Sequence, residues 1–448
     1  MTSPVLTALI AEPVVVRQAY RSVLDPIIFY GLFGLLLFGP AAFGATEPWS
    51  IFLLEAGSSF LFLLWIIRQA QAGEVMVTRS PLFAPMLSFT ALVGLQLLGG
   101  YTAYRYQTFR SALLYVAYGA LVFLVVQSLR RTSQAKSLTI LISVYGFAVA
   151  TFALVQSMSS SGKLYWLRTP RSGGWIFGPY VNHNHYAGLM EMLVPIPLVF
   201  ALSRYAHGSR RTMAAVAAAV MASTIFLSGS RGGMVAFAIE MAILAGVLLR
   251  QRKSKRLALV LGAFLVISVG LLAWLGGGEL TRRMASIRSE ARAELSGGTR
   301  LDITRDGLKM FARKPVVGWG LGVFPDVYPE FRTFYSDLFV NAAHDDYLQL
   351  LVEMGGLGFI LMLWFLVIVY RRAAKKISKW VHDVNGATAL AATLGITGIL
   401  VHSLFDFNLQ IPANAALFYV LCALAAMEPR FGLTRRRNSH TQEADAAA

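Results

Sequence analysis

The chain has 448 residues, of which 56% are hydrophobic and 14% charged, and its mean hydropathy is +0.58. This composition is too apolar for a soluble globular domain and is typical of a polytopic membrane protein. The formal charge is +17, but the basic residues are dispersed over many short segments and form no recognised nucleic-acid-binding module, so no nucleic acid is expected as a partner.

Mostly apolar runs long enough to cross a bilayer, about 17 to 25 residues each, recur along the chain. A bilayer offers no partner for an open strand edge, so these runs predict helices. The expected fold is an all-α polytopic membrane protein with about 12 transmembrane helices and one long periplasmic helical loop. The expected spans are 27–44, 50–67, 82–99, 111–128, 137–157, 186–203, 212–228, 233–249, 257–276, 346–370, 386–404 and 411–427.

The positions of Lys and Arg predict how these spans are oriented. Cytoplasmic connections carry an excess of both residue types, and most of the 40 basic residues fall in segments that are cytoplasmic if the N-terminus is inside. Both termini are then cytoplasmic, with residues 428–448 as a cytoplasmic tail. The start of the chain, Met1–Asp25, lacks the pattern of a signal peptide. The single cysteine, Cys422, excludes an intramolecular disulfide.

A few cations fall on the outer side, against this pattern. They suggest an anionic ligand there, whereas a structural salt bridge or a contact with lipid headgroups explains each one equally well. These cations are Arg105, Arg110, Lys163, Arg168, Arg171 and Arg231.

The longest connection, residues 277–345, lies on the outer side between the ninth and tenth spans. Within it, Thr281–Leu295 predicts an amphipathic surface helix and Thr299–Ala312 predicts a second helix. The glycines around Trp319 predict either close backbone approach or a simple turn. A loop of this length is seldom a mere connection, so we expect an enzyme working at the outer face. A transporter built from two similar halves is the rival class, but no repeat is evident.

Two pairs of Asn and His precede the sixth span, in the order Asn182, His183, Asn184, His185. Histidines two residues apart suggest a metal site, but no Cys or carboxylate is adjacent and the two rings would not share one helical face. Metal binding is therefore not expected. Asn182 and Asn184 are the expected hydrogen-bonding or helix-capping groups.

Three arginines are candidate anion ligands. Arg231 lies in the short turn Ser228–Gly233, where its guanidinium can bind phosphate oxygens in bidentate fashion; the alternative is an arginine that reaches lipid headgroups. Arg300 and Arg305 lie in the long loop. For Arg305, a pair with an aspartate of its own helix, Asp302 or Asp306, is the common outcome.

His344 lies where the long loop re-enters the membrane, directly before Asp345 and Asp346. A neutral imidazole can take a proton from a sugar hydroxyl near pH 7. Either aspartate orients this ring or caps the following helix. Asp406, between the last two spans, either holds a basic residue of the site, contacts an acceptor sugar or pairs with an outer arginine.

The order of Ser230-Arg231-Gly232, Arg300, Lys314-Pro315, Gly318-Trp319-Gly320 and His344 resembles the O-antigen ligase and polymerase superfamily of bacterial membrane glycosyltransferases. The resemblance spans roughly residues 174–406. It implies a multi-pass enzyme of the bacterial inner (cytoplasmic) membrane. The implied donor is an undecaprenyl diphosphate-linked glycan, and the implied acceptor is lipid A core or another glycan. His344 would be the catalytic base, and Arg231 and Arg300 would bind the diphosphate. Supporting positions are Asn182, Asn184, Arg305, Asp345 and Asp406.

The resemblance leaves the acceptor open. Repeat-unit polymerases and protein O-oligosaccharyltransferases share the loop signature, and Asp345 stands where ligases often carry Asn, Ser or Gln. We expect ligation to lipid A core, with O-antigen or exopolysaccharide polymerisation as the alternative and a lipid-linked glycan transporter as the alternative of another class. The chain contains no Asp-x-Asp pair, so neither a metal nor a cofactor is expected.

Overall fold

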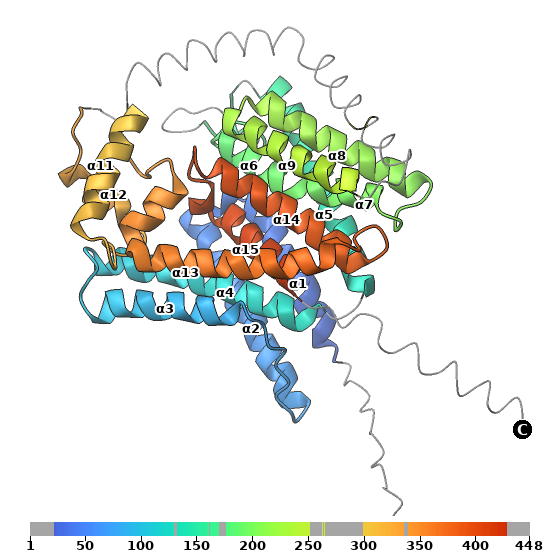
Figure 1. The fold of residues 1–448 in the computed structure, drawn as a ribbon, viewed down its shortest axis with the longest axis horizontal. Helices are drawn as coiled ribbons and strands as arrows, with labels where there is room; N and C mark the ends of the chain where they lie inside the picture. Colours follow the sequence, from blue (N-terminus) through green and yellow to red (C-terminus); the bar gives the residue numbers. More distant parts are fainter. Residues whose placement is uncertain are drawn as a thin grey trace, which may run out of the picture.

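The computed structural model describes residues 22–129, 132–160, 162–169, 176–250, 262, 264, 299–335 and 339–427. This part of the chain is a bundle of long helices, with a smaller helical unit beyond one end of it (Figure 1). Its only β-type pairing is two isolated bridges, between Leu164 and Arg168 and between Phe177 and Tyr180.

Eleven of the predicted spans correspond to helices in the described part of the chain. They are α1 (Leu24–Ala41), α2 (Pro48–Gln71), α3 (Phe83–Leu98), α4 (Arg105–Ser128), α5 (Thr132–Ser159), α6 (His183–Leu193) continued by α7 (Pro195–Leu202), α8 (Ser209–Ser228), α9 (Arg231–Arg250), α13 (Asp346–Ile377), α14 (Val384–His402) and α15 (Pro412–Ala426). Nine spans of the described residues are long and apolar enough to cross a membrane; α3 and α15 are apolar but shorter. The protein is an all-α polytopic membrane protein.

Several expectations fall outside the described residues and are not addressed by the structure. They are the start of the chain to residue 21, most of the ninth span at 257–276, the amphipathic helix Thr281–Leu295, and the tail 428–448.

The sixth span differs from the single helix predicted at 186–203. It begins three residues earlier, at His183, and is broken after Val194, because Pro195 has no N–H to continue the helical ladder and starts a new helix instead. Within the combined span, residues 185–199, 201 and 202 are all buried. This span therefore lies in the centre of the bundle, and polar side chains on it are shielded from lipid.

The tenth span is longer than predicted and is kinked. Helix α13 runs on to Ile377, because the Arg and Lys residues after 370 are good helix formers. At Gly355 the backbone has φ 65° and ψ −172°. A Cβ there would lie 2.2 Å from the carbonyl oxygen of Val316, and the N–H of Gly356 donates to the Pro315 oxygen at 2.7 Å. The kink is thus where the long loop docks against α13.

The described end of the long loop is the smaller helical unit. It contains α11 (Thr299–Arg313), α12 (Phe324–Val327) and a 3₁₀ turn, η2 (Tyr328–Glu330); the helix predicted at Thr299–Ala312 is confirmed. The unit has its own apolar cluster, which includes Ile303, Met310, Val323, Phe324, Val327, Tyr328 and Phe331. It lies beside the start of α13 (Figure 1).

Buried polar groups fix this unit to the bundle. The side-chain nitrogen of Gln96 on α3 donates to the carbonyl oxygens of Val317 (2.6 Å) and Glu353 (2.9 Å), and its oxygen accepts from the N–H of Leu321. The Glu353 carboxylate accepts from the N–H of Gly322 at 2.7 Å. The close backbone approach predicted around Trp319 is therefore present, and it holds the loop at the entrance of α13.

Candidate functional site

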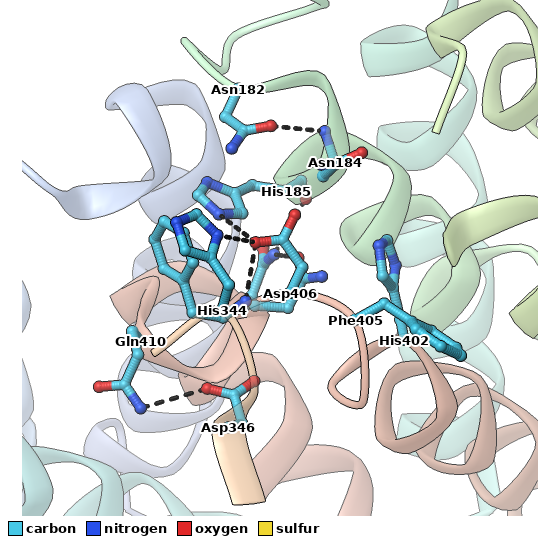
Figure 2. A network of polar contacts seen from close by, with 12 residues as sticks. Asn182, Asn184, His185, His344, Asp346, His402, Phe405, Asp406 and Gln410 are labelled. Carbon is cyan, nitrogen blue, oxygen red and sulfur yellow. Dashed lines mark hydrogen bonds and ion pairs between the residues drawn. The ribbon is translucent and has the colours of Figure 1, made fainter. Parts of the chain in front are cut away.

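The candidate site is built around residues 402–410, which connect α14 to α15 at the end of the bundle where α6 and α13 begin. We call these residues the 402–410 segment. Figure 2 shows side chains from the start of α6, from His344 just ahead of α13 and from this segment lying together.

His344 lies two residues before α13, as predicted for the tenth span. Asp345 is the N-cap of α13 and accepts hydrogen bonds from the N–H groups of Tyr347 (2.9 Å) and Leu348 (3.1 Å). The capping alternative therefore accounts for Asp345. His344 has φ +54°, so the chain turns sharply just outside the helix, and its side chain is 28% exposed.

The carboxyl group that faces His344 belongs to Asp406. The Oδ1 atom of Asp406 lies 3.7 Å from Nδ1 of His344 and 4.0 Å from Nε2 of His185. The same atom accepts a hydrogen bond from the N–H of Phe407 at 2.8 Å. Asp406 is 1% exposed and His185 is 6% exposed. Two imidazoles thus share one buried carboxylate, and His344 is the more accessible of them (Figure 2).

The surroundings of Asp406 keep it ionised. Burial alone would raise its pKa, but the imidazoles of His344, His185 and His402 outweigh burial and hold the pKa of the Asp406 carboxyl well below its ordinary value. A negative charge beside Nδ1 favours the tautomer of His344 that carries its proton on Nδ1. The other ring nitrogen, Nε2, is then the proton acceptor.

The ring of Phe407 packs against both imidazoles. It makes edge-on contacts with His185 (centroids 4.8 Å apart, 75° between planes) and with His344 (4.9 Å, 81°). An apolar ring against both imidazoles lowers the local polarity and so strengthens their interaction with Asp406.

Asp346 ties the start of α13 to the 402–410 segment. Its carboxylate accepts hydrogen bonds from Ser403 Oγ (2.8 Å), the N–H of Leu409 (3.0 Å) and Gln410 Nε2 (3.2 Å). Its own N–H donates to the Ser403 carbonyl at 3.0 Å. Because His344 precedes this helix and Asp406 lies within the segment, these bonds fix His344 relative to Asp406.

Both predicted diphosphate ligands belong to elements that contact the same segment. Nη1 of Arg300 donates to the Phe405 carbonyl at 3.1 Å. Arg231 is the first residue of α9 and is exposed; the preceding Ser230 places Oγ 3.4 Å from Nε2 of His402. Two guanidinium groups and the His344–Asp406 pair are therefore connected through a few residues.

The other predicted arginine has a local partner. Arg305 forms an ion pair with Asp302 on its own helix, with 3.5 Å between Nη1 and Oδ1, and its side chain is 66% exposed. The local-pair alternative accounts for Arg305, so the geometry gives it no role in the site.

Asn182 and Asn184 form a helix cap. The side-chain oxygen of Asn182 accepts from the N–H of Asn184 at 2.8 Å, which starts α6 (Figure 2). Starting the helix here directs His185 toward Asp406, and Asn414 Nδ2 holds the His185 carbonyl at 2.9 Å. Among the described residues, no three His, Cys, Asp or Glu side chains are arranged to hold a metal ion.

Comparison with known families identifies the region that carries much of this geometry. Residues 216–363 match the family model described as O-antigen ligase. This match covers about a third of the chain and supports a relationship to the O-antigen ligase superfamily. No curated protein matches the chain. A match to this ligase and polymerase type of family indicates a membrane glycosyltransferase-like enzyme whose partners are, in general, a lipid-linked glycan and a glycan acceptor.

The region that matches the O-antigen ligase model includes Arg231, Arg300 and His344, but not the whole site. Asn182, His185, His402 and Asp406 lie outside residues 216–363. The candidate site therefore combines residues within the matched region with residues on α6 and the 402–410 segment.

Sequence reasoning missed His185 and His402. The sequence suggests His185 only as a possible metal ligand and does not single out His402. Each is a histidine at a membrane-span end, which is a weak signal. Their partners, Asp406 and Glu191, are more than two hundred residues away along the chain, so no local pattern predicts the contacts.

One of the cations predicted to lie on the outer side has a structural partner. Arg168 pairs with Glu47 at 2.7 Å and lies over the ring of Phe43. The salt-bridge alternative therefore accounts for Arg168. Arg171 lies outside the described residues.

Proposed function

We propose that this protein is an O-antigen ligase-like glycosyltransferase that moves a glycan from an undecaprenyl diphosphate carrier to a sugar hydroxyl of lipid A core at the periplasmic face. The observation that supports it best is the pairing of His344 with the buried carboxylate of Asp406, on a segment that also contacts the elements bearing Arg231 and Arg300. The distribution of Lys and Arg supports the periplasmic location of this end of the bundle.

In the proposed reaction His344 is the general base. Its Nε2 takes the proton of the acceptor hydroxyl while that oxygen attacks the anomeric carbon of the donor. The bond from this carbon to the diphosphate oxygen breaks, and its electron pair leaves with the diphosphate. Asp406 stabilises the resulting imidazolium. The products are the glycosylated acceptor, undecaprenyl diphosphate and one proton.

Arg231 and Arg300 stabilise the departing group in this proposal. The diphosphate gains negative charge as the bond breaks, and guanidinium groups bind phosphate oxygens through paired, charge-assisted hydrogen bonds. Two arginines supply this stabilisation without a divalent cation. Asn182, Asn184 and Asp345 support the reaction by starting the helices that carry His185 and follow His344.

The first test compares cells that carry wild-type, His344→Ala or His207→Ala protein in place of the chromosomal copy. His207 is an exposed histidine on the connection between α7 and α8 and serves as the matched control. We expect His344→Ala to lose at least about 100-fold in transfer, so that long glycan disappears from lipid A core and lipid-linked polymer accumulates at unchanged protein abundance. Wild-type transfer by His344→Ala would remove the base assignment.

Gene deletion and an assay of the purified protein separate the alternatives. A repeat-unit polymerase uses the same donor and base, and Asp345, at a position where ligases often carry Asn, Ser or Gln, favours it as the second candidate. Single-repeat stubs on the core after gene deletion would indicate a polymerase. A lipid-linked glycan transporter would instead leave the donor on the cytoplasmic side, and purified protein would transfer no sugar.

A further inference from the structure

A second pair of ionisable side chains lies deeper in the bundle than His344 and Asp406, and the proposed reaction does not use it. Nδ1 of His402, the last residue of α14, lies 2.9 Å from Oε1 of Glu191 on α6. His402 is 1% exposed and Glu191 is fully buried. Burying both groups within a membrane bundle is costly unless they are paired. We therefore expect the buried His402–Glu191 pair to have a function.

The other ring nitrogen of His402 faces the turn that carries Arg231. Nε2 lies 3.4 Å from Oγ of Ser230, which is fully buried. Ser230 Oγ in turn accepts from the N–H of Gly233 at 3.2 Å and so starts α9. One set of proton positions is consistent with both contacts of the His402 ring: Ser230 donates to Nε2, and Nδ1–H donates to Glu191.

Gly232 and Gly233 of this turn pack closely against His402 and Glu191. A Cβ on Gly232 would lie 2.6 Å from Cδ2 and 2.8 Å from Nε2 of His402. A Cβ on Gly233 would lie 2.9 Å from Oε1 of Glu191. Three of the four residues Ser230–Gly233 therefore pack on the His402–Glu191 pair, and the fourth is Arg231.

We propose that Glu191 and His402 are positioning residues that hold the Ser230–Gly233 turn and thereby place the Arg231 guanidinium at the donor's diphosphate. This inference rests on the proposed diphosphate role of Arg231. Glu191 fixes the tautomer and orientation of His402, His402 fixes Ser230, and Ser230 fixes the first turn of α9. The long Arg231 side chain then extends from a backbone position that these contacts hold in place.

The test measures binding of undecaprenyl diphosphate, without any sugar, to the full-length protein in detergent. Ser230→Ala removes the hydroxyl that faces Nε2 and leaves the Glu191–His402 pair in place. His402→Asn keeps a donor near Glu191 but no longer reaches Ser230, whereas His402→Gln reaches Ser230. We expect Ser230→Ala and His402→Asn to weaken binding roughly tenfold, the size of one hydrogen bond in this setting, and His402→Gln to bind more tightly than His402→Asn.

Two further variants make the result specific. In an Arg231→Ala background, which itself weakens binding, adding His402→Asn should cause no further loss, because residues that act through one group are not additive. Glu240→Gln is the matched control: Glu240 is a fully buried carboxyl on α9 that packs against Gly398, and its loss should leave binding unchanged.

The outcomes are distinct. Wild-type binding by Ser230→Ala and His402→Asn, with binding impaired in Arg231→Ala, overturns this inference and leaves the proposed function standing. If His402→Asn weakens binding equally in the wild-type and Arg231→Ala backgrounds, the inference is also overturned, because His402 would then not act through Arg231. Wild-type binding by Arg231→Ala removes the diphosphate assignment and this inference with it. Should His402→Asn fail to fold, Ser230→Ala decides.

Discussion

His344 is held in a backbone conformation that residues other than glycine rarely adopt. Its φ of +54° lies in the left-handed region. Asp345 and Asp346 maintain it from the C-terminal side, one by capping α13 and the other by bonding to the 402–410 segment. Local strain of this kind persists where the surroundings over-determine the backbone. Here it turns the imidazole toward Asp406.

Asp406→Asn should lower transfer on the order of 100-fold, because the imidazolium formed during reaction loses its charged partner. Transfer assays at matched protein abundance measure this loss. Asp406→Asn keeps the shape of the side chain and removes its charge, so wild-type transfer by this variant would contradict a role for the carboxylate.

His185→Leu should lower transfer about tenfold, because Asp406 loses one of the two imidazoles beside its carboxylate. His185→Gln keeps a donor nitrogen close to the position of Nε2 and should recover most of the activity. Transfer assays at matched protein abundance check this. Equal activity of the two variants would contradict a role through Asp406.

The beginning of α13 shows how one buried carboxylate fixes an element. Asp346 receives three hydrogen bonds from the 402–410 segment and is 7% exposed. The start of α13 and the irregular 402–410 segment would not keep a fixed position relative to each other by themselves. The carboxylate provides the cross-link between them.

Asp346→Asn should destabilise the protein by about 1–3 kcal/mol, since an amide nitrogen would face donors that need an acceptor. Thermal unfolding in detergent measures this. Asp302→Asn is the control: it breaks an exposed pair with Arg305, and pairs of this kind contribute about 0–1 kcal/mol. Similar melting temperatures for the two variants would contradict the assignment.

The kink of α13 makes a second prediction. Gly355→Ala should lower the free energy of unfolding by more than about 2 kcal/mol, because Ala is strained at this φ and ψ and its Cβ would collide with the Val316 oxygen. Gly94→Ala in α3 is the matched control, since nothing lies within 4 Å of the added Cβ. Unfolding midpoints that fall equally in both variants, or in neither, would be inconsistent with this explanation.

For the molecule as a whole, the membrane architecture follows from sequence and the site follows only in part. Hydropathy predicts the spans because each is a local run of apolar side chains. The loop helix α11 is also local and was predicted. The meeting of His185 with Asp406, and of Glu191 with His402, depends on how distant helices pack, which no run of residues encodes. For Asp346 the sequence leaves open a role in orienting His344 or in capping the following helix, whereas its side-chain hydrogen bonds go to the 402–410 segment.

Orientation in the membrane can be tested with cysteine labels. The native Cys422 is buried and should not react. We expect Lys309→Cys on α11 to react with a membrane-impermeant maleimide in intact spheroplasts, and Lys379→Cys, beyond the far end of α13, to react only after permeabilisation. Both lysines are exposed. The reverse labelling pattern would invert the proposed topology.

The apolar cluster of the unit formed by α11, α12 and η2 has an implication for how such proteins diversify. Its core residues come mainly from the loop itself, and its contacts with the bundle include those of Gln96, Glu353 and the kink at Gly355. The outer surface of the unit is therefore less constrained in sequence than the seam that contacts the bundle. We expect exchange of the whole unit between related proteins at this seam to preserve the fold of the membrane bundle.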